Sequence, residues 1–232
     1  MEGPSYNLPF KPVTIMFIGD LQWLGADSGN TATTVLKEHI RRATEQGMKL
    51  IGMGDYTDFL SPSNRQKLSA AGLYDTAIKG IDGYARSLTQ DVFEVLKSTK
   101  GQWLGLVEGH HFHHYRAGTT SDMELAEKLD APFLGTSAII RLVFTGPSSR
   151  KQIPVTLFVH HGVGQGQTGY YPVARLEKVA AGWEEIDVFA MGHTCKIAIE
   201  STQKVRPRWP KGKFDVTHRK ILLIGTGGSS KT

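Results

Sequence analysis

Histidine is the residue type whose spacing in this sequence most clearly indicates chemistry. The chain contains nine histidines and a single cysteine. Seven of the histidines fall in three short clusters, and the cysteine follows the last of them: His110, His111, His113 and His114; His160 and His161; His193 and then Cys195. Neutral imidazoles and thiolates are ligands for divalent transition metals, so this grouping indicates a metal-binding site.

The composition limits the classes of protein to which the chain can belong. Its 232 residues, 40% hydrophobic and 21% charged, suit one soluble globular domain spanning residues 1–232. Since no run of 18 apolar residues and no signal-peptide pattern is present, we expect neither a membrane span nor a membrane partner. A lone cysteine excludes an internal disulfide framework and predicts a cytoplasmic protein. The net charge of +5 favours an anionic partner, such as nucleic acid or a phosphate-bearing substrate.

Short apolar runs alternate with segments of helical periodicity, which is the pattern of an α/β fold. The expected strands are residues 13–18, 48–53, 103–107, 137–144, 153–159, 188–191, 197–201 and 221–224, and the expected helices are residues 34–46, about 75–99, 121–129 and 173–181. Ser121 and Glu124 are placed to form a capping box at the start of the third helix. The Gly/Ser/Lys segment after residue 224 is expected to be too polar to pack.

The loops after these strands carry carboxylates and imidazoles next to glycine. They read Gly19-Asp20, Gly54-Asp55, Glu108-Gly109-His110-His111, His160-His161-Gly162 and Gly192-His193. Because ligands bind at the carboxyl ends of strands in open α/β sheets, the five loops are expected to converge. Asp55 is the natural candidate to bridge two ions, since a carboxylate has lone pairs for both. Two ions about 3.5–4 Å apart clamp a phosphoryl group and activate a shared water, which suits phosphoester hydrolysis.

These blocks resemble, in order, the pattern of the calcineurin-like metallophosphoesterases, which runs Asp-x-His, Gly-Asp-x-x-Asp, Gly-Asn-His, His-Gly and Gly-His-x-His. The resemblance covers residues from about 13 to 200, and the glycine-rich segment after His161 also resembles phage-type members. It implies a four-layer α-β-β-α sandwich of two mixed sheets flanked by helices. It also implies that a metal-bridged hydroxide attacks the phosphorus in line with the leaving group.

The resemblance assigns metal ligands position by position. Asp20 and Asp55 are implied ligands, with Asp55 bridging the two ions. His161 and His193 are implied to complete the second metal site. His160 stays open as the alternative to His161, because from the sequence either could face the metals.

The resemblance also assigns catalytic roles. His111 stands at the family's histidine that protonates the leaving oxygen, so His111 and Asp55 are the implied catalytic residues. Asp58 is expected beside the ligands, as a neighbouring or capping residue. His113 and His114 are candidates for substrate contact at the rim of the pocket, with an ordinary surface position as the alternative.

Three positions depart from the family pattern. Gln22 stands where the family has histidine, His110 where it has asparagine, and Cys195 where it has the last histidine. The implied outcome is an asymmetric pair of ions. One ion has Asp55, His110, His161 and His193, and the other has Asp20, Asp55, Gln22 and Cys195. A thiolate favours zinc or iron over manganese, and the ions are expected to be Mn, Zn, Fe or Ni.

A basic stretch near the C-terminus is the best candidate for contact with nucleic acid. Cations interleave with proline and tryptophan over residues 204–213, and Arg206 and Arg208 are the named candidates for binding substrate. A solvated hairpin loop is the alternative. The resulting prediction is a metal-dependent phosphodiesterase, acting on nucleic acid among other phosphoesters. The alternatives are a broad phosphomonoesterase or phosphoprotein phosphatase, and a catalytically weakened module that binds metal or nucleic acid.

Overall fold

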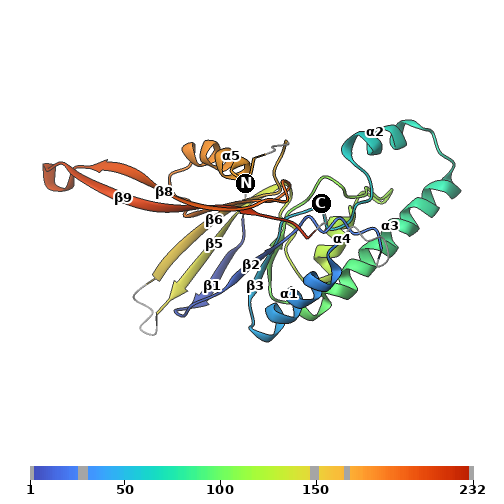
Figure 1. Cartoon of the computed structure of the whole chain (residues 1–232), viewed down its shortest axis with the longest axis horizontal. Helices are drawn as coiled ribbons and strands as arrows, with labels where there is room; N and C mark the ends of the chain where they lie inside the picture. Colours follow the sequence, from blue (N-terminus) through green and yellow to red (C-terminus); the bar gives the residue numbers. More distant parts are fainter. Residues whose placement is uncertain (1–2, 26–30, 147–151, 165–167, 230–232) are drawn as a thin grey trace.

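The fold is mixed α/β, with two sheets and five α-helices in the part of the chain that the structure describes (Figure 1). The structure, a computed structural model, describes residues 3–25, 31–146, 152–164 and 168–229. The larger sheet has the order β1(Ser5–Pro9), β5(Ser137–Thr145), β6(Gln152–His160), β7(Val188–Met191), β9(Asp215–Thr226) and β8(Ile197–Arg208). The smaller sheet has the order β2(Ile15–Ile18), β3(Lys49–Gly52) and β4(Trp103–Leu106).

The helices lie between these strands in the sequence. They are α1(Thr33–Glu45), α2(Pro62–Ala70), α3(Asp75–Leu96), α4(Ser121–Lys128) and α5(Tyr171–Ala181), with two short 3-10 turns, η1(Lys97–Thr99) and η2(Pro210–Gly212). The buried residues of α1 are Leu36, Ile40 and Ala43, at the spacing of one helical face. None of the helices within the described ranges is long and apolar enough to cross a membrane.

Three apolar clusters hold these elements together. The first joins the smaller sheet to α1, α3 and α4 through residues such as Leu50, Leu36 and Val92. The second lies between the two sheets, where Ile51 packs with residues of β5 and β6. The third joins α5 to the larger sheet (Figure 1). Continuous apolar runs predict β3 and β4 because both faces of these strands are buried.

The structure corrects several expectations about the elements. The smaller sheet is purely parallel, whereas two mixed sheets were expected. Strand β1 and helix α2 were not predicted, because β1 has little apolar pattern and α2 buries none of its residues. Strands β8 and β9 each have 12 residues, well beyond the apolar cores of 197–201 and 221–224. They form a long antiparallel hairpin, whose outer part is polar and half-exposed.

Two local expectations were also wrong. The cap of α4 is Thr120, whose hydroxyl accepts a hydrogen bond from Met123 N at 3.2 Å. Ser121 is not the cap, because its hydroxyl accepts from His113 N at 3.0 Å. The polar segment after β9 does pack: Ser229 N donates to Asp20 O at 3.2 Å, and Ser229 O accepts from Ala32 N at 2.8 Å. Backbone hydrogen bonds hold this segment, so its polar side chains do not prevent packing.

Candidate metal centre

The strand ends of both sheets bring imidazoles and carboxylates together. Asp20 follows β2, Asp55 follows β3, and the histidine loop, residues 108–112, follows β4; His161 and His193 follow β6 and β7. Within the described residues, two groups have ligand atoms that all lie within 4.8 Å of one another: His110, His161 and His193; and Asp20, Asp55 and His161. We call these the imidazole group and the carboxylate group. Either could hold a metal ion.

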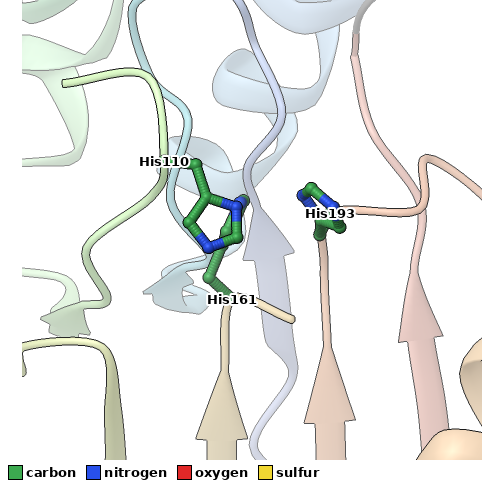
Figure 2. A group of neighbouring side chains, drawn as sticks. All are labelled: His110, His161 and His193. Carbon is green, nitrogen blue, oxygen red and sulfur yellow. The ribbon is translucent and has the colours of Figure 1, made fainter. Parts of the chain in front are cut away.

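The imidazole group consists of three rings carried by three separate loops (Figure 2). The ring centroid of His110 lies 4.6 Å from that of His161 and 4.8 Å from that of His193, and the rings of His161 and His193 are 5.1 Å apart. Three imidazoles are a ligand set that suits zinc and other divalent transition metals. The planes of each pair of rings cross at steep angles, between 70° and 84°.

His161 shows most directly that the site fits a cation. Its Nδ1 lies 2.6 Å from Met53 O, and a carbonyl only accepts, so Nδ1 carries the proton. In the neutral ring, Nε2 therefore has a free lone pair. This atom is buried without a hydrogen-bond partner. Asp55 Oδ2 lies 3.3 Å from it without hydrogen-bond alignment. This buried pair needs a positive charge between its two atoms, which either a proton on Nε2 or a bound divalent metal supplies.

The carboxylate group gives the same indication. Asp20 is fully buried, and its Oδ2 accepts from His193 N at 2.9 Å, while its Oδ1 has no hydrogen-bond partner. Asp55 is 2% exposed, and its Oδ1 accepts from the backbone N–H groups of His110 and His111. Leaving a buried carboxylate oxygen unpaired is costly, so Asp20 Oδ1 is a second atom that suits a cation ligand.

The pKa values of the residues in the two groups reflect their burial and their short distances from one another. Burial raises the pKa of Asp20 to about 7. Burial would also raise the pKa of Asp55, but the adjacent His161 and the backbone donors hold it well below its usual range. Burial lowers and Asp55 raises the pKa of His161, and the net result is about 9. Burial and the neighbouring imidazoles lower the pKa of His110 to about 4. Without metal the site binds protons instead, so metal binding releases protons.

Backbone strain concentrates at this site. Seven non-glycine residues within the described ranges have positive φ, and five of them belong to the loops of the site: Asp20 (48°), Gln22 (47°), Asp55 (52°), His193 (66°) and Cys195 (51°). Such conformations cost energy outside glycine and persist only where the surroundings impose them. Their concentration in the loops of one site supports a functional role for these loops.

Gly109 lets the histidine loop approach Asp55. A Cβ atom added at Gly109 would lie 2.1 Å from Asp55 N and 2.2 Å from Asp55 Oδ1. No side chain fits this space, because the neighbouring atoms are backbone and a buried carboxylate. Gly109 is therefore required because the backbone of the histidine loop packs directly against the backbone of Asp55.

Two residues that the sequence analysis missed hold the histidine loop in place. Arg65 on α2 donates to the carbonyls of Leu60, His110 and Phe112, and its guanidinium lies 4.0 Å from the centroid of the Phe112 ring. Asp122 on α4 is buried, and its Oδ2 accepts from Gly109 N at 3.0 Å. Their partners are backbone atoms, which leave no pattern in the sequence.

His111 is oriented by Asp58. Its Nδ1 lies 2.6 Å from Asp58 Oδ1, so the carboxylate fixes the ring and leaves Nε2 as the second titrating atom. Asp58 raises the pKa of His111. Asp58 thus lies beside the ligands, where the sequence analysis expected it.

The structure places the remaining expected ligands around the two groups. His160 belongs to neither group, and its ring stacks on Phe158 with the centroids 6.3 Å apart. Gln22 donates from its backbone N–H to Asp55 O at 3.0 Å. Cys195 belongs to neither group, and its Sγ lies 4.0 Å from His193 O. A Cβ at Gly228 would lie 2.7 Å from Asp20 Cβ and 3.0 Å from Cys195 Sγ, so the thiol is close to the carboxylate group.

The four expected substrate contacts lie outside the two groups. His113 is 5% exposed and its Nε2 lies 2.7 Å from Asp82 Oδ1, so it is a buried structural residue. His114 is exposed and, with His113, lines a cavity of about 300 Å³ between α2 and α3. Arg206 and Arg208 lie on the hairpin, opposite Thr217 and Asp215, whereas the metal side of β9 ends at Thr226. The two arginines therefore lie away from the metal ligands, on a hairpin that is longer than its apolar core predicts.

Comparison of the sequence with protein-family models and with curated protein sequences finds no match. The class of this site therefore follows from its geometry and chemistry.

Proposed function

We propose that the chain is a metal-dependent phosphodiesterase with the calcineurin-like arrangement of strand-end ligands. The observation that carries the proposal is the pair of buried, unpartnered atoms, Asp20 Oδ1 and His161 Nε2, in two adjoining ligand groups. The order of the ligand loops along the chain supports the family resemblance. The three apolar clusters support a four-layer sandwich, with one cluster between the sheets and one under the helices on each side.

The two ligand groups favour two ions of unequal affinity. With Nδ1 bonded to Met53 O, His161 has one lone pair left and can serve only one ion. His110, His161, His193 and one oxygen of Asp55 would hold the first ion. The second ion would have Asp20 and Asp55, and Gln22 or Cys195 would have to complete its ligands. A divalent metal bound here supplies positive charge beside the phosphoryl oxygens and lowers the pKa of its water.

The chain's own residues supply the rest of the chemistry. His111, held by Asp58, is the candidate to give a proton from Nε2 to the leaving oxygen, and its raised pKa keeps that proton available near neutral pH. Arg65 and Asp122 position the loop that carries His110 and His111. The net charge of +5 favours a polyanionic substrate such as nucleic acid, whose linkages are phosphodiesters.

The decisive experiment compares bis-p-nitrophenyl phosphate with p-nitrophenyl phosphate, using metal-stripped protein to which Mn²⁺, Zn²⁺, Ni²⁺ or Mg²⁺ is added. We expect turnover of the diester, and its loss in Asp55→Asn and His193→Ala. His160→Ala is the matched control, because it removes a neighbouring imidazole that belongs to neither ligand group. Single- and double-stranded DNA extend the same panel to polymeric substrates.

The other outcomes select the alternatives. Preference for the monoester would indicate a phosphomonoesterase or phosphoprotein phosphatase. No turnover with any metal, together with nucleic-acid binding that Asp55→Asn leaves unchanged, would indicate a binding module without catalysis.

A further inference from the structure

The outer end of the β8–β9 hairpin is a prominent feature that the metal centre does not use. We call residues 208–214 the arm tip. Strand β8 has 12 residues, so at about 3.3 Å per residue the arm tip lies roughly 35 Å from the end of β8 that adjoins the metal centre. Figure 1 shows the hairpin projecting past α5 and β6, away from the rest of the molecule.

The cations of the hairpin stem are already engaged. Lys204 donates to the carbonyls of Ala180 and Trp183 at the end of α5. Two arginines pair with the acidic connection between α5 and β7: Arg206 with Glu184 and Glu185, and Arg219 with Glu185 and Asp187. These contacts fix the stem against the body and place the guanidinium groups of Arg206 and Arg219 in ion pairs.

The arm tip has the opposite character. Trp209 is 63% exposed and Phe214 is 67% exposed, with their ring centroids 5.7 Å apart. Arg208, Lys211 and Lys213 alternate with them along the chain, and none of the three has an ion pair within the described ranges. The one carboxylate of this end of the hairpin is Asp215, whose Oδ1 accepts from Val216 N at 2.8 Å.

We propose that the arm tip is a binding site for single-stranded nucleic acid. Exposed aromatic rings stack on bases of any sequence, and adjacent cations bind the phosphates between them. The proposal rests on the proposed phosphodiesterase function and specifies its substrate. Because arm tip and metal centre are roughly 35 Å apart, only a polymer contacts both at once.

The order of residues at the arm tip favours nucleic acid over a membrane surface. The two rings flank the turn, while Lys211 and Lys213 lie within it, on the outermost part of the hairpin. A turn that inserted its rings into a bilayer would carry these ammonium groups deeper than the rings, which is costly. A hydrated polyanion accommodates rings and cations at the same depth.

The test measures binding of the full-length protein to a fluorescent 20-nucleotide oligothymidylate with phosphorothioate linkages, which resist hydrolysis. Fluorescence anisotropy at several salt concentrations gives the Kd. The double variant Trp209→Ala/Phe214→Ala should raise the Kd at least fivefold for each ring removed. A fivefold increase is the lower bound expected when one base loses its stacking partner. Lys211→Gln/Lys213→Gln should raise the Kd about tenfold and flatten the salt slope by about 1.4. Lys37→Gln/Lys100→Gln is the control, since it removes two exposed cations far along the chain from the arm tip.

The outcomes separate this proposal from the function on which it rests. If the tip variants weaken oligonucleotide binding but the protein hydrolyses no diester, the arm tip is a binding site and the proposed phosphodiesterase function is wrong. Turnover of bis-p-nitrophenyl phosphate should be equal in wild type and tip variants. The proposal is overturned if the tip variants bind the oligonucleotide as wild type does, or if the control pair weakens binding equally. It is also overturned if the tip variants lose binding to phosphatidylserine vesicles or change the oligomeric state, with oligonucleotide binding intact.

Discussion

The imidazole group and the carboxylate group differ in how much of a metal site each already contains. Three imidazole nitrogens meet in the first, and Asp55 lies beside His161. The second has two carboxylates whose negative charges repel, and it lacks a ligand of its own once His161 serves the first ion. The two halves of one site are thus expected to bind metal with different strength, because they differ in ligand number and charge.

The two groups also differ in backbone geometry. Asp20 and Asp55 both have positive φ, whereas His193 is the only member of the imidazole group that does. Both aspartates of the carboxylate group thus depend on surroundings that hold this backbone conformation in place.

The largest effect is expected for His161→Ala, because His161 is the one residue common to both groups. Loss of this ligand should weaken binding of the tighter ion about 10²–10³-fold, as expected for one of about four ligands. Calorimetric titration of Zn²⁺ into stripped protein measures the change. His160→Ala is the control and should leave the affinity within about twofold. Equal affinities for His161→Ala and wild type would show that the groups do not form the metal site.

The sequence was most informative where local pattern and chemistry coincide. Short apolar runs ending in Gly-Asp or in histidine predicted the strand ends, and the structure brings Asp20, Asp55, His110, His161 and His193 together there. Strands buried on both faces leave a strong apolar signal, and glycine marks the turn that follows them. These features depend on neighbours in sequence, so they can be read without the fold.

What the sequence did not predict depends on distant contacts. Arg65 bonds to backbone carbonyls some 45 residues away, and α2 has no apolar face that would predict a helix. Choosing His161 over His160 needed the direction of the last residues of β6. Arg206 was assigned to substrate because its charge is visible in the sequence and its partner Glu184 is not. Tertiary pairing, rather than residue type, determined each of these outcomes.

Gly109→Ala tests whether the two groups share one rigid support. The added Cβ would collide with Asp55 N and Oδ1, so Asp55 and the histidine loop must move apart. We expect a loss of about 1–3 kcal/mol in the free energy of unfolding and about 100-fold in diesterase activity. Urea denaturation and initial rates measure the two effects. Gly80→Ala in α3 is the control, since nothing lies within 4 Å of its added Cβ, and it should stabilise by about 0.5–1 kcal/mol.

Asp122→Asn tests the support of the imidazole group through pH. Burial raises the pKa of Asp122 from its usual 3.8 to about 7. Between these values the folded protein holds a proton that the unfolded chain releases, so this group's contribution to the free energy of unfolding falls as the pH rises from about 4 to 7. Asparagine keeps an acceptor for Gly109 N and removes the titration. As the pH rises over this range, the free energy of unfolding of wild type should therefore fall by about 2–3 kcal/mol relative to that of the variant.

Urea denaturation with EDTA at pH 4.5 and pH 7 measures this difference between Asp122→Asn and wild type. Asp130→Asn is the matched control, because Asp130 is exposed and its φ of 57° suits asparagine equally well. Parallel pH profiles for wild type and Asp122→Asn would show that Asp122 is ionised in the folded protein at both pH values.

The smallest effect is expected for Cys195→Ser, which acts on the weaker carboxylate group alone. The thiol lies near Asp20, and a thiolate ligand favours zinc or iron over manganese. At the site of the second ion, we expect the ratio of Zn²⁺ affinity to Mn²⁺ affinity to fall roughly tenfold in the variant. Binding of the first ion should not change. Metal analysis after dialysis measures both occupancies, and Gln22→His should strengthen the same ion by restoring an imidazole at the position. Two equally occupied Mn²⁺ ions in wild type, with Cys195 freely alkylated while they are bound, would instead show that the two groups are equivalent and that the thiol is no ligand.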